Sequence, residues 1–394
     1  MAVLGTYDAI IVGAGACGST TAYYLCQEGF SVALIDRGHV GREASWASAG
    51  MIGPESCPER DPWFLAATSL SRSLYDQLES ELVESTGSHV PYGGNGHLVI
   101  ARRENEVEKL EQLADQQQSN DLVVELLDGR ETRNREPAAP EDVIAAGLMP
   151  EGRYIDARAF TTTIARAAEQ HGAVIHEEHP VIGFVREGTR VRGVRCGNDE
   201  FLADIVINTA GAWAGQIDQD LSHPVFPLHG QIMAVSGPSC GLRHNMSRAG
   251  IWGYVTPRPG GRIIVGATQD QWGYQKKNTP EGMAYLHQII QDVMPALSDR
   301  PVLETWSGLR PGTIDNLPTV GPDPRVTRGY LWGAGHASSG MMQIPATAKV
   351  LVDLASDRPP RLDIRQLSIE RYIVDGDPNP KTSIARTEKR FMSI

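Results

Sequence analysis

The sequence has few cysteines and no cysteine pair. Cys17, Cys26, Cys57, Cys196 and Cys240 are odd in number and widely scattered through 394 residues. Without a C-x-x-C pair, neither a zinc site nor a redox disulfide is expected, and such thiols are typical of a reducing compartment. No apolar run approaches the length of a membrane span, and the N-terminus lacks the basic region and cleavage site of a signal peptide. We therefore expect a cytoplasmic protein with no metal and no membrane partner.

Basic residues are also in deficit. The chain has 36 Lys and Arg against 48 Asp and Glu, a formal net charge of −12. This balance argues against a nucleic-acid surface, because phosphate binding rewards basic patches. The 41% hydrophobic and 21% charged content is that of an ordinary soluble protein, long enough for roughly two or three domains. Small molecules are the expected partners.

The N-terminal segment carries the clearest motif. Residues 7–12 form an apolar run, which is typical of a parallel strand covered on both faces. Gly13, Gly15 and Gly18 follow: the first permits a tight turn, the second lets the backbone approach a pyrophosphate, and the third lets a helix lie close to the strand. Residues 16–28 have helical spacing, so the amides at the helix start face the phosphates. The segment predicts a dinucleotide-binding fold.

An acidic residue completes this motif. A second strand is expected at 31–35, and Asp36 follows it at close to the roughly 20 residues after the glycine loop where an acid binds ribose hydroxyls. Such a carboxylate would repel a 2′-phosphate, although Arg37 leaves NADP open as an alternative.

Small residues mark two further segments that could face a ligand. Residues 41–53 are dense in Ala, Ser and Gly, which suits backbone lying against a flat ligand; a flexible surface loop is the alternative. Gly335 to Gly340 read GHASSG and precede an apolar helix at 341–354, whose positive end would point at whatever lies before it. A helix that is merely capped there remains the alternative.

The rest of the chain alternates between two kinds of pattern. Thr209, Ala210 and Gly211 end an expected strand, a position where α/β sheets bind ligands. Between 225 and 304 alternating strand patterns predict an antiparallel sheet. The remaining expected helices are 64–82 and 157–171, and the remaining expected strands are 97–101, 122–126, 173–176, 181–185, 191–195, 201–208, 228–235, 251–256 and 262–267.

Several of these motifs together resemble the D-amino-acid oxidase family of flavoproteins, and within it the glycine oxidases. The likeness runs from Tyr7 to about Leu354. It is carried by the 13–18 loop, ASWASAGM at 44–51, TAGAW at 209–213, GYVTPR at 253–258, WSGLRPGT at 306–313, and the Gly335-His336 pair leading to PAT at 345–347.

The resemblance implies an α/β fold with two parts. A Rossmann-like FAD-binding domain of the glutathione-reductase type would comprise 1–87, 151–224 and 305–365. An inserted α+β substrate domain on an antiparallel sheet would comprise 88–150 and 225–304, and 366–394 would be a C-terminal tail.

The resemblance also implies which residues hold the cofactor. FAD would lie across the first domain, with Asp36 on the adenosine ribose and a noncovalent flavin, because no cysteine follows Cys240. The implied cofactor-binding residues are Gly13, Gly15, Ala16, Cys17, Gly18, Asp36, Arg37, Ala44, Ser45, Ala49, Gly50, Met51, Val181, Ala210, Gly211, His336, Ala337, Ser338, Ser339, Gly340, Met341 and Met342.

Three residues are implied at the substrate. Arg310 corresponds to the family's carboxylate-binding arginine, whose planar guanidinium can donate two parallel hydrogen bonds. Tyr254 corresponds to a tyrosine that reaches the substrate; a surface arginine and a core tyrosine are the ordinary alternatives. Ser338 stands where the family has an arginine near the substrate. The missing charge puts glycine in doubt as the preferred substrate and makes D-amino acids or sarcosine candidates.

The implied activity is oxidative deamination by hydride transfer to flavin N5, with O2 as the second substrate and 2-oxo acid, ammonia and hydrogen peroxide as products. The alternatives are a D-amino-acid dehydrogenase with another acceptor, a non-catalytic flavin-binding protein, and a nicotinamide-binding sensor. The family also suggests a homo-oligomer, specifically a homotetramer, and a link to thiamine biosynthesis.

Overall fold

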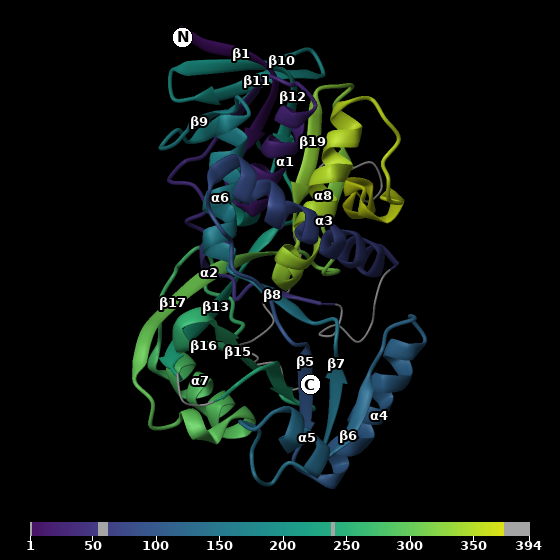
Figure 1. The fold of residues 1–394 in the computed structure, drawn as a ribbon. Coiled ribbons are helices and arrows are strands. Elements are labelled where there is room, and N and C mark those ends of the chain that lie inside the picture. Colours follow the sequence, from purple (N-terminus) through teal and green to yellow (C-terminus); the bar gives the residue numbers. More distant parts are fainter. Residues whose placement is uncertain (1, 54–61, 238–240, 374–394) are drawn as a thin grey trace.

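The computed structural model describes residues 2–53, 62–237 and 241–373. Cys57, Cys240 and the tail from 374 onward lie outside the described residues. The described chain forms an upper part around one large sheet and a lower part around another (Figure 1).

The first sheet is built around the parallel strand β1 (Ala2–Val12), which is buried from Ala9 to Val12. Its order is β10-β11-β12-β1-β2-β9, with β19 beside β12 and β18 beside β19. Strands β12, β1, β2 and β9 pair in parallel. Along β1 the side chains of Ala9 and Ile11 join one core cluster and those of Ile10 and Val12 join another, as expected for a strand covered on both faces. The other strands are β2 (Val32–Ile35), β9 (Val174–His176), β10 (Val181–Glu187), β11 (Arg190–Cys196), β12 (Asp199–Asn208), β18 (Thr319–Pro322) and β19 (Tyr330–Ala334).

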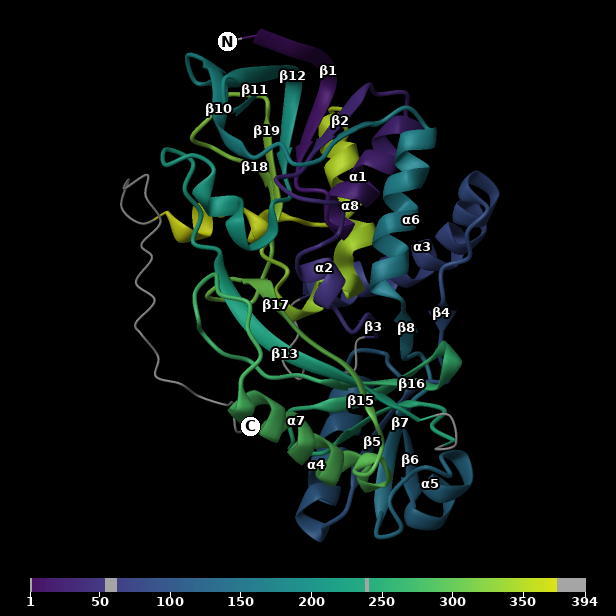
Figure 2. The ribbon, with the colours of Figure 1, turned by 90° about the vertical axis from the view of Figure 1, so that its left-hand side faces the viewer.

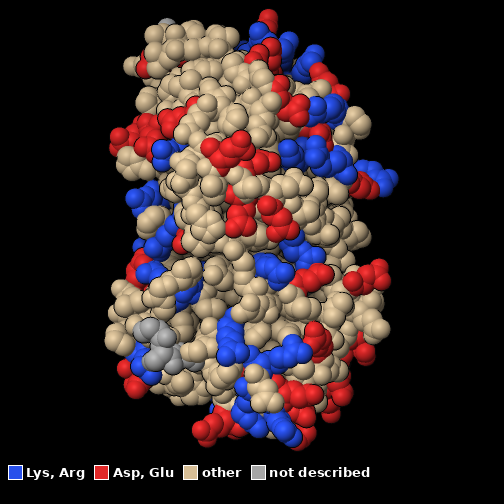
Figure 3. Space-filling view, viewed as in Figure 1, with Lys and Arg blue, Asp and Glu red and all other residues tan. Residues whose placement is uncertain are grey.

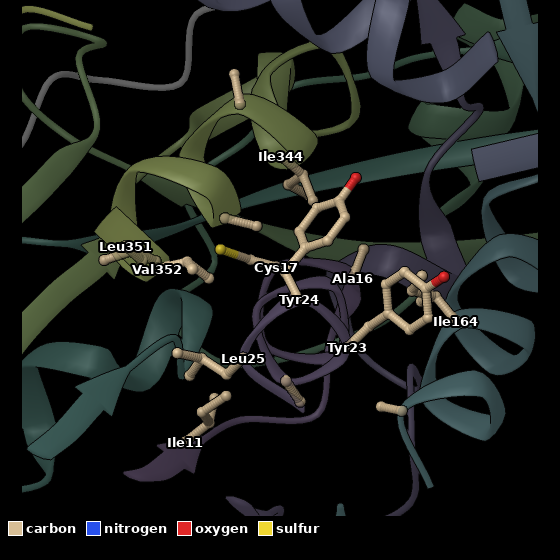
Figure 4. Packing of buried hydrophobic residues seen from close by; sticks show 14 of the residues in the cluster. Ile11, Ala16, Cys17, Tyr23, Tyr24, Leu25, Ile164, Ile344, Leu351 and Val352 are labelled. Atoms are coloured by element: carbon tan, nitrogen blue, oxygen red, sulfur yellow. The ribbon is translucent and has the colours of Figure 1, made fainter. Parts of the chain in front are cut away.

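Four helices cover one face of this sheet. They are α1 (Ala16–Gln27), α3 (Pro62–Thr86), α6 (Ala157–Gln170) and α8 (Gly340–Ala355). Tyr24 and Leu25 of α1 pack in one cluster with Ile164 of α6 and Leu351 of α8 (Figure 4). Each fully buried apolar side chain contributes about 1.5–3 kcal/mol relative to exposure. This cluster holds the start of α1 in place against the end of β1.

The second sheet lies below the first and has the order β17-β13-β16-β15-β14-β5-β7-β6 (Figure 2). All its pairs are antiparallel except β14 with β5. Alternate residues point to opposite faces: Val255 joins the core under helix α7 (Pro280–Val293), while Tyr254 joins the cluster on the other face. The strands are β5 (His97–Ala101), β6 (Glu125–Asp128), β7 (Ala145–Met149), β13 (Phe226–Ser236), β14 (Asn245–Arg248), β15 (Tyr254–Arg258), β16 (Arg262–Gly266) and β17 (Val302–Gly312).

Short elements complete the fold. A three-stranded sheet of β3 (Met51–Ile52), β8 (Arg153–Ile155) and β4 (Tyr92–Gly93) lies between the two large sheets (Figure 2). The remaining helices are α2 (Ala44–Ala47), α4 (Glu104–Gln118) and α5 (Gly129–Arg135). Strand β17 pairs with β13 along nearly its whole length. The boundary predicted at 304/305 therefore falls inside a continuous strand of the second sheet.

The expected fold class is confirmed, with local differences. Helix α7 was not predicted, although Thr279 accepts a hydrogen bond from the Gly282 amide and Pro280 occupies the first turn, both ordinary helix-start signals. Strand β14 was also missed, and the strand predicted at 251–256 begins and ends later, at β15. The strand predicted at 122–126 is β6, shifted toward the C-terminus. Pairing with neighbouring strands, which single-strand patterns do not show, sets these limits.

Surface charges of both signs are interspersed in the upper and lower halves of the face in Figure 3. Among the described residues, no helix combines the length and apolar character needed to cross a bilayer, and no cluster of three or more His, Cys, Asp or Glu side chains could hold a metal ion.

Candidate functional site

A large cavity of about 1110 Å³ runs from the glycine loop of the first sheet to the second sheet. Of the predicted cofactor and substrate residues, all but Gly18 line it. The pattern at the N-terminus and the motifs near the C-terminus, far apart in sequence, thus meet around one space. The strip between them, α2 and β3, lies between the two large sheets in Figure 2.

The glycine loop brings bare backbone to one end of this cavity. Gly13 has φ of +104°, and a Cβ there would lie 2.6 Å from the Thr209 carbonyl oxygen. A Cβ on Gly18 would lie 2.0 Å from the Gly13 carbonyl oxygen, so Gly18 acts in packing α1 against the turn rather than in lining the cavity. Gly15 is the N-cap residue of α1. The positive end of the helix therefore faces the cavity, as an anion requires.

Asp36 is fixed beside this loop by backbone amides. Its carboxylate accepts hydrogen bonds from the amides of Ala14, at 2.7 Å, and Gly38, at 2.8 Å. Burial raises the pKa of the carboxyl group, while the two amides lower it. A carboxylate has about four acceptor positions, so Asp36 retains capacity for hydroxyl donors in the cavity.

Arg37 is already engaged. Its guanidinium pairs with Glu43 at 2.7 Å and stacks 3.6 Å from the centre of the Trp213 ring. Those contacts, together with Asp36, argue against the NADP alternative, because a 2′-phosphate would need a free cation there.

The Ala- and Ser-rich strip lines the cavity and is hydrogen-bonded by residues from other elements. The Ser45 hydroxyl accepts from the Ala16 amide at 2.9 Å. The carbonyl of Trp46 accepts from Arg158 at 3.0 Å, that of Ala47 accepts from Trp306 at 3.2 Å, and that of Ala49 accepts from Arg258.

Gly50 ends this strip. It has φ of +67°, and a Cβ there would lie 1.9 Å from the Ile155 carbonyl oxygen, so only glycine fits. The strip presents small side chains and backbone to the cavity.

Helix α8 meets the cavity with its N-terminus, as predicted. A short 3-10 turn, Ala337–Ser339, precedes it, and residues 336–342 line the cavity. His336 donates to or accepts from the Thr347 hydroxyl at 3.0 Å, and burial lowers its pKa to about 4. The ring is therefore neutral at neutral pH and holds the turn against α8.

Arg310 and Tyr254 lie on the wall formed by the second sheet. One Arg310 guanidinium nitrogen donates to the Thr268 carbonyl at 3.2 Å. Two glycines make room for these side chains: a Cβ on Gly230 would lie 2.2 Å from an Arg310 nitrogen, and one on Gly266 would lie 2.6 Å from the Tyr254 hydroxyl. The sheet thus lets both polar groups lie flat across it, facing the cavity.

Sequence reasoning missed several residues of the cavity and its walls. His97, Ser247, Trp252 and Gln269 line the cavity, and Arg258 fixes the strip from behind. Ser247 and Tyr254 are paired across β14 and β15, a signal available only once strand β14 is known. The described cysteines, Cys17, Cys26 and Cys196, are buried, and burial raises the pKa of the Cys17 thiol to about 12.

Comparison with known proteins defines the class. A family model described as FAD dependent oxidoreductase matches residues 8–354, and the chain belongs to this family. The predicted family, FAD as cofactor and an oxidoreductase are thereby confirmed. Over 355 residues the chain is 29% identical to the glycine oxidase of Bacillus subtilis (strain 168), covering 89% of this chain and 94% of that protein.

Solved structures agree. Glycine oxidase from Geobacillus kaustophilus matches with a TM-score of 0.87 at 26% identity, covering 92% of this chain and 98% of that one. Iminodiacetate oxidase from Chelativorans sp. BNC1 matches with a TM-score of 0.83 at 27% identity, covering 91% and 98%.

The residues present fit FAD. Gly13 and Gly15 bring bare backbone and the N-terminus of α1 to the cavity, Asp36 keeps acceptor capacity, and the 44–51 strip offers a wall of small residues. The cavity is long enough to reach from this loop to Arg310, and its volume suits a large cofactor with a small substrate.

Proposed function

We propose that this protein is an FAD-dependent oxidase of glycine or another small amino acid, such as sarcosine or a D-amino acid. The observation that carries the proposal is Arg310, a guanidinium in the cavity wall beside Tyr254. Within the described residues Arg310 forms no ion pair. A buried guanidinium whose charge is not neutralised by a direct ion pair is costly, so the site is suited to an anionic ligand.

Arg310 binds the substrate carboxylate in this proposal. Burial lowers the pKa of the guanidinium, but arginine remains charged at neutral pH. The hydrogen bond to Thr268 fixes one edge of the group, and the other N–H groups remain for two parallel bonds to a carboxylate. Asp270, which also interacts with Arg310, is engaged by the Thr268 hydroxyl at 3.1 Å.

Tyr254 supplies the second contact. Burial raises the pKa of its hydroxyl, and Arg310 partly offsets the rise, so the phenol stays protonated and donates a hydrogen bond. Two donors from different strands of the same sheet, Arg310 on β17 and Tyr254 on β15, fix both the position and the rotation of a small carboxylate. The Cα–H bond is then directed toward the strip that would hold the flavin, and orientation of this kind accounts for much of the rate enhancement.

FAD, when bound, supplies the acceptor for the hydride of the Cα–H bond. The chain's own contribution is binding, orientation and exclusion of water. Ile232, Ile251 and Trp252 line the cavity near the anchor and keep its wall largely apolar. A substrate with a neutral amine needs no strong protein base, which agrees with the predicted mechanism.

The proposed range of substrates rests on the relatives of the chain and on Ser338. Relatives named glycine oxidase and iminodiacetate oxidase support a small amino acid with or without an N-substituent. Ser338 is exposed and lines the cavity. In place of the arginine typical of the family, it leaves room for a substrate larger than glycine.

The finer predictions remain parts of this proposal: noncovalent FAD, O2 as oxidant with hydrogen peroxide as product, the residues assigned to FAD and substrate, the two discontinuous domains, a homotetramer, a cytoplasmic location, and a product used in thiamine biosynthesis.

Anaerobic mixing of the yellow protein with glycine, sarcosine and D-amino acids tests the activity. We expect at least one of them to bleach the flavin absorbance and air to restore it with one peroxide per turnover. Bleaching without peroxide would assign the protein to the dehydrogenases, and no bleaching by any amino acid would refute the proposal.

A further inference from the structure

A row of paired residues crosses the second sheet on the face turned to the cavity. Gly266, Tyr254, Ser247 and Val99 are successive partners across β16, β15, β14 and β5. Paired residues on neighbouring strands point to the same face. His97 lies two residues before Val99 and shares this face, and Tyr254, Ser247, Val99 and His97 all line the cavity. The wall that carries Tyr254 therefore continues to Ser247 and His97.

Ser247 and His97 form a hydrogen-bonded pair. The Nε2 atom of His97 lies 2.8 Å from the Ser247 hydroxyl oxygen. Burial lowers the pKa of His97 to about 4, so its ring is uncharged at neutral pH. An imidazole and a hydroxyl together hold both donor and acceptor positions. This uncharged pair can therefore form a further hydrogen bond with a polar group of a ligand.

The residues around this pair are mostly apolar, or they are polar and already hydrogen-bonded within the protein. Val99, the strand partner of Ser247, and Ile251 line the same cavity. Asn245, the strand partner of His97, already binds the Arg153 carbonyl and the Thr256 hydroxyl. A polar pair in an apolar wall is the usual arrangement of a small-molecule site, where few polar groups fix orientation.

We propose that His97 and Ser247 form a substrate subsite that selects an uncharged polar group, a hydroxyl or an amide, on the substituent of the amino acid. The inference rests on the proposed function, since Arg310 and Tyr254 must anchor the carboxylate. Neighbouring strands lie about 4.8 Å apart. Ser247 is thus one strand and His97 two strands beyond Tyr254, which suits a substituent of a few atoms.

A second carboxylate fits this subsite less well. It would need a charged partner, and the buried His97 ring resists protonation. The predicted order is therefore a hydroxyl or amide above an alkyl group, and an alkyl group above a carboxylate.

Matched substrates test the subsite. D-Serine and D-alanine differ by one hydroxyl, as do N-(2-hydroxyethyl)glycine and N-ethylglycine. In the holoenzyme we expect kcat/KM to favour the hydroxyl member of at least one pair by about ten-fold, because a hydrogen bond at a buried site discriminates by that order. In Ser247→Ala the preference should fall to about two-fold or less. Val99→Ala, which leaves the polar pair in place, should keep it.

A binding measurement separates selection from a structural role. The Kd of 3-hydroxypropanoate and of propanoate, read from the change in flavin absorbance, should show the same preference without turnover. His97→Gln should weaken it less than His97→Leu, because an amide can replace part of the hydrogen bonding. Flavin content identifies variants that fail to fold.

The outcomes are distinct from those of the proposed function. If amino acids bleach the flavin but both pairs give ratios near one, or if Ser247→Ala keeps the wild-type ratio, the subsite is refuted while the oxidase remains. If no amino acid bleaches the flavin, the oxidase itself is refuted and the inference falls with it.

Discussion

The two ends of the cavity are built in different ways. The end proposed for the dinucleotide is formed by residues close together in sequence, the 13–18 loop and Asp36, and it is held together largely by backbone groups. The end proposed for the substrate has the side chains of Arg310, Tyr254 and Ser247, which come from three separate strands of the second sheet. The first end depends on glycines, which have no side chain, and the second depends on side chains that the sheet brings together.

This difference predicts which kind of substitution disrupts each end of the cavity. At the glycine loop an added atom collides with backbone, and the chain can relieve the collision only by moving a core strand or helix. At the sheet wall a lost side chain removes one contact and leaves the frame in place. The first kind of change should abolish cofactor binding, and the second should alter substrate use.

The largest effect is expected from Gly18→Val. The new Cβ would lie 2.0 Å from the Gly13 carbonyl oxygen and 2.6 Å from the Thr209 hydroxyl. We expect FAD affinity to fall more than about 100-fold and stability to fall by roughly 3 kcal/mol. Flavin content after purification and urea unfolding measure the two effects. Gly183→Ala, where nothing lies within 4 Å, is the control and should change neither. A Gly18→Val protein with full flavin content would contradict the packing argument.

Arg310→Leu should act on the other end alone. Loss of a charged, two-bond anchor is expected to lower kcat/KM for every carboxylate substrate by roughly 100- to 1,000-fold. Arg310→Lys should recover only part of this, because an ammonium lacks the planar fork. The Kd of FAD should stay within about two-fold in both variants. A parallel loss of FAD affinity would mean that the two ends are not separable.

The same difference explains how much the sequence could predict. The glycine loop, Asp36 and α1 are local features, and each has a signal in the order of residues. Arg310 and Tyr254 were found only through resemblance to a family, because their neighbours in space come from other strands. Ser247 and His97 were missed, since neither a lone serine nor a lone histidine in a strand has a signal until the register of β14 with β15 and β5 is known.

A substitution of Arg258 tests whether the two ends of the cavity are structurally coupled. It lies on β15, the strand of Tyr254, and donates to the Ala49 carbonyl in the strip. Burial lowers its pKa to about 10. Arg258→Met should leave that carbonyl without its donor, a cost of about 1–3 kcal/mol. We expect both the affinity for FAD and kcat/KM to fall about ten-fold.

The matched control is Arg328→Met, whose side chain is 66% exposed, and it should change neither quantity. If Arg258→Met lowered only one of the two, Arg258 would belong to that end and would not couple them.

The smallest effect concerns two buried histidines of the cavity wall. His336 and His97 have pKa values of about 4 in the folded protein, against an ordinary value of 6.5. The unfolded chain therefore binds more protons as pH falls from 6.5 toward 4, and folding stability falls over that window. Each ring should cost about 2 kcal/mol at pH 5 relative to pH 7. Urea unfolding at the two pH values should show His336→Gln and His97→Gln losing less stability on acidification than the wild type.

His39 provides the opposite sign for the same measurement. It is exposed, and its hydrogen bond with Glu177 raises its pKa. Its contribution is present at low pH and is lost as pH rises through the folded pKa, so His39→Gln should not reduce the sensitivity to acid. Equal acid sensitivity in the wild type and both buried variants would show that these rings are already solvated. The cavity wall would then be more open to water than the packing around His336 and His97 indicates.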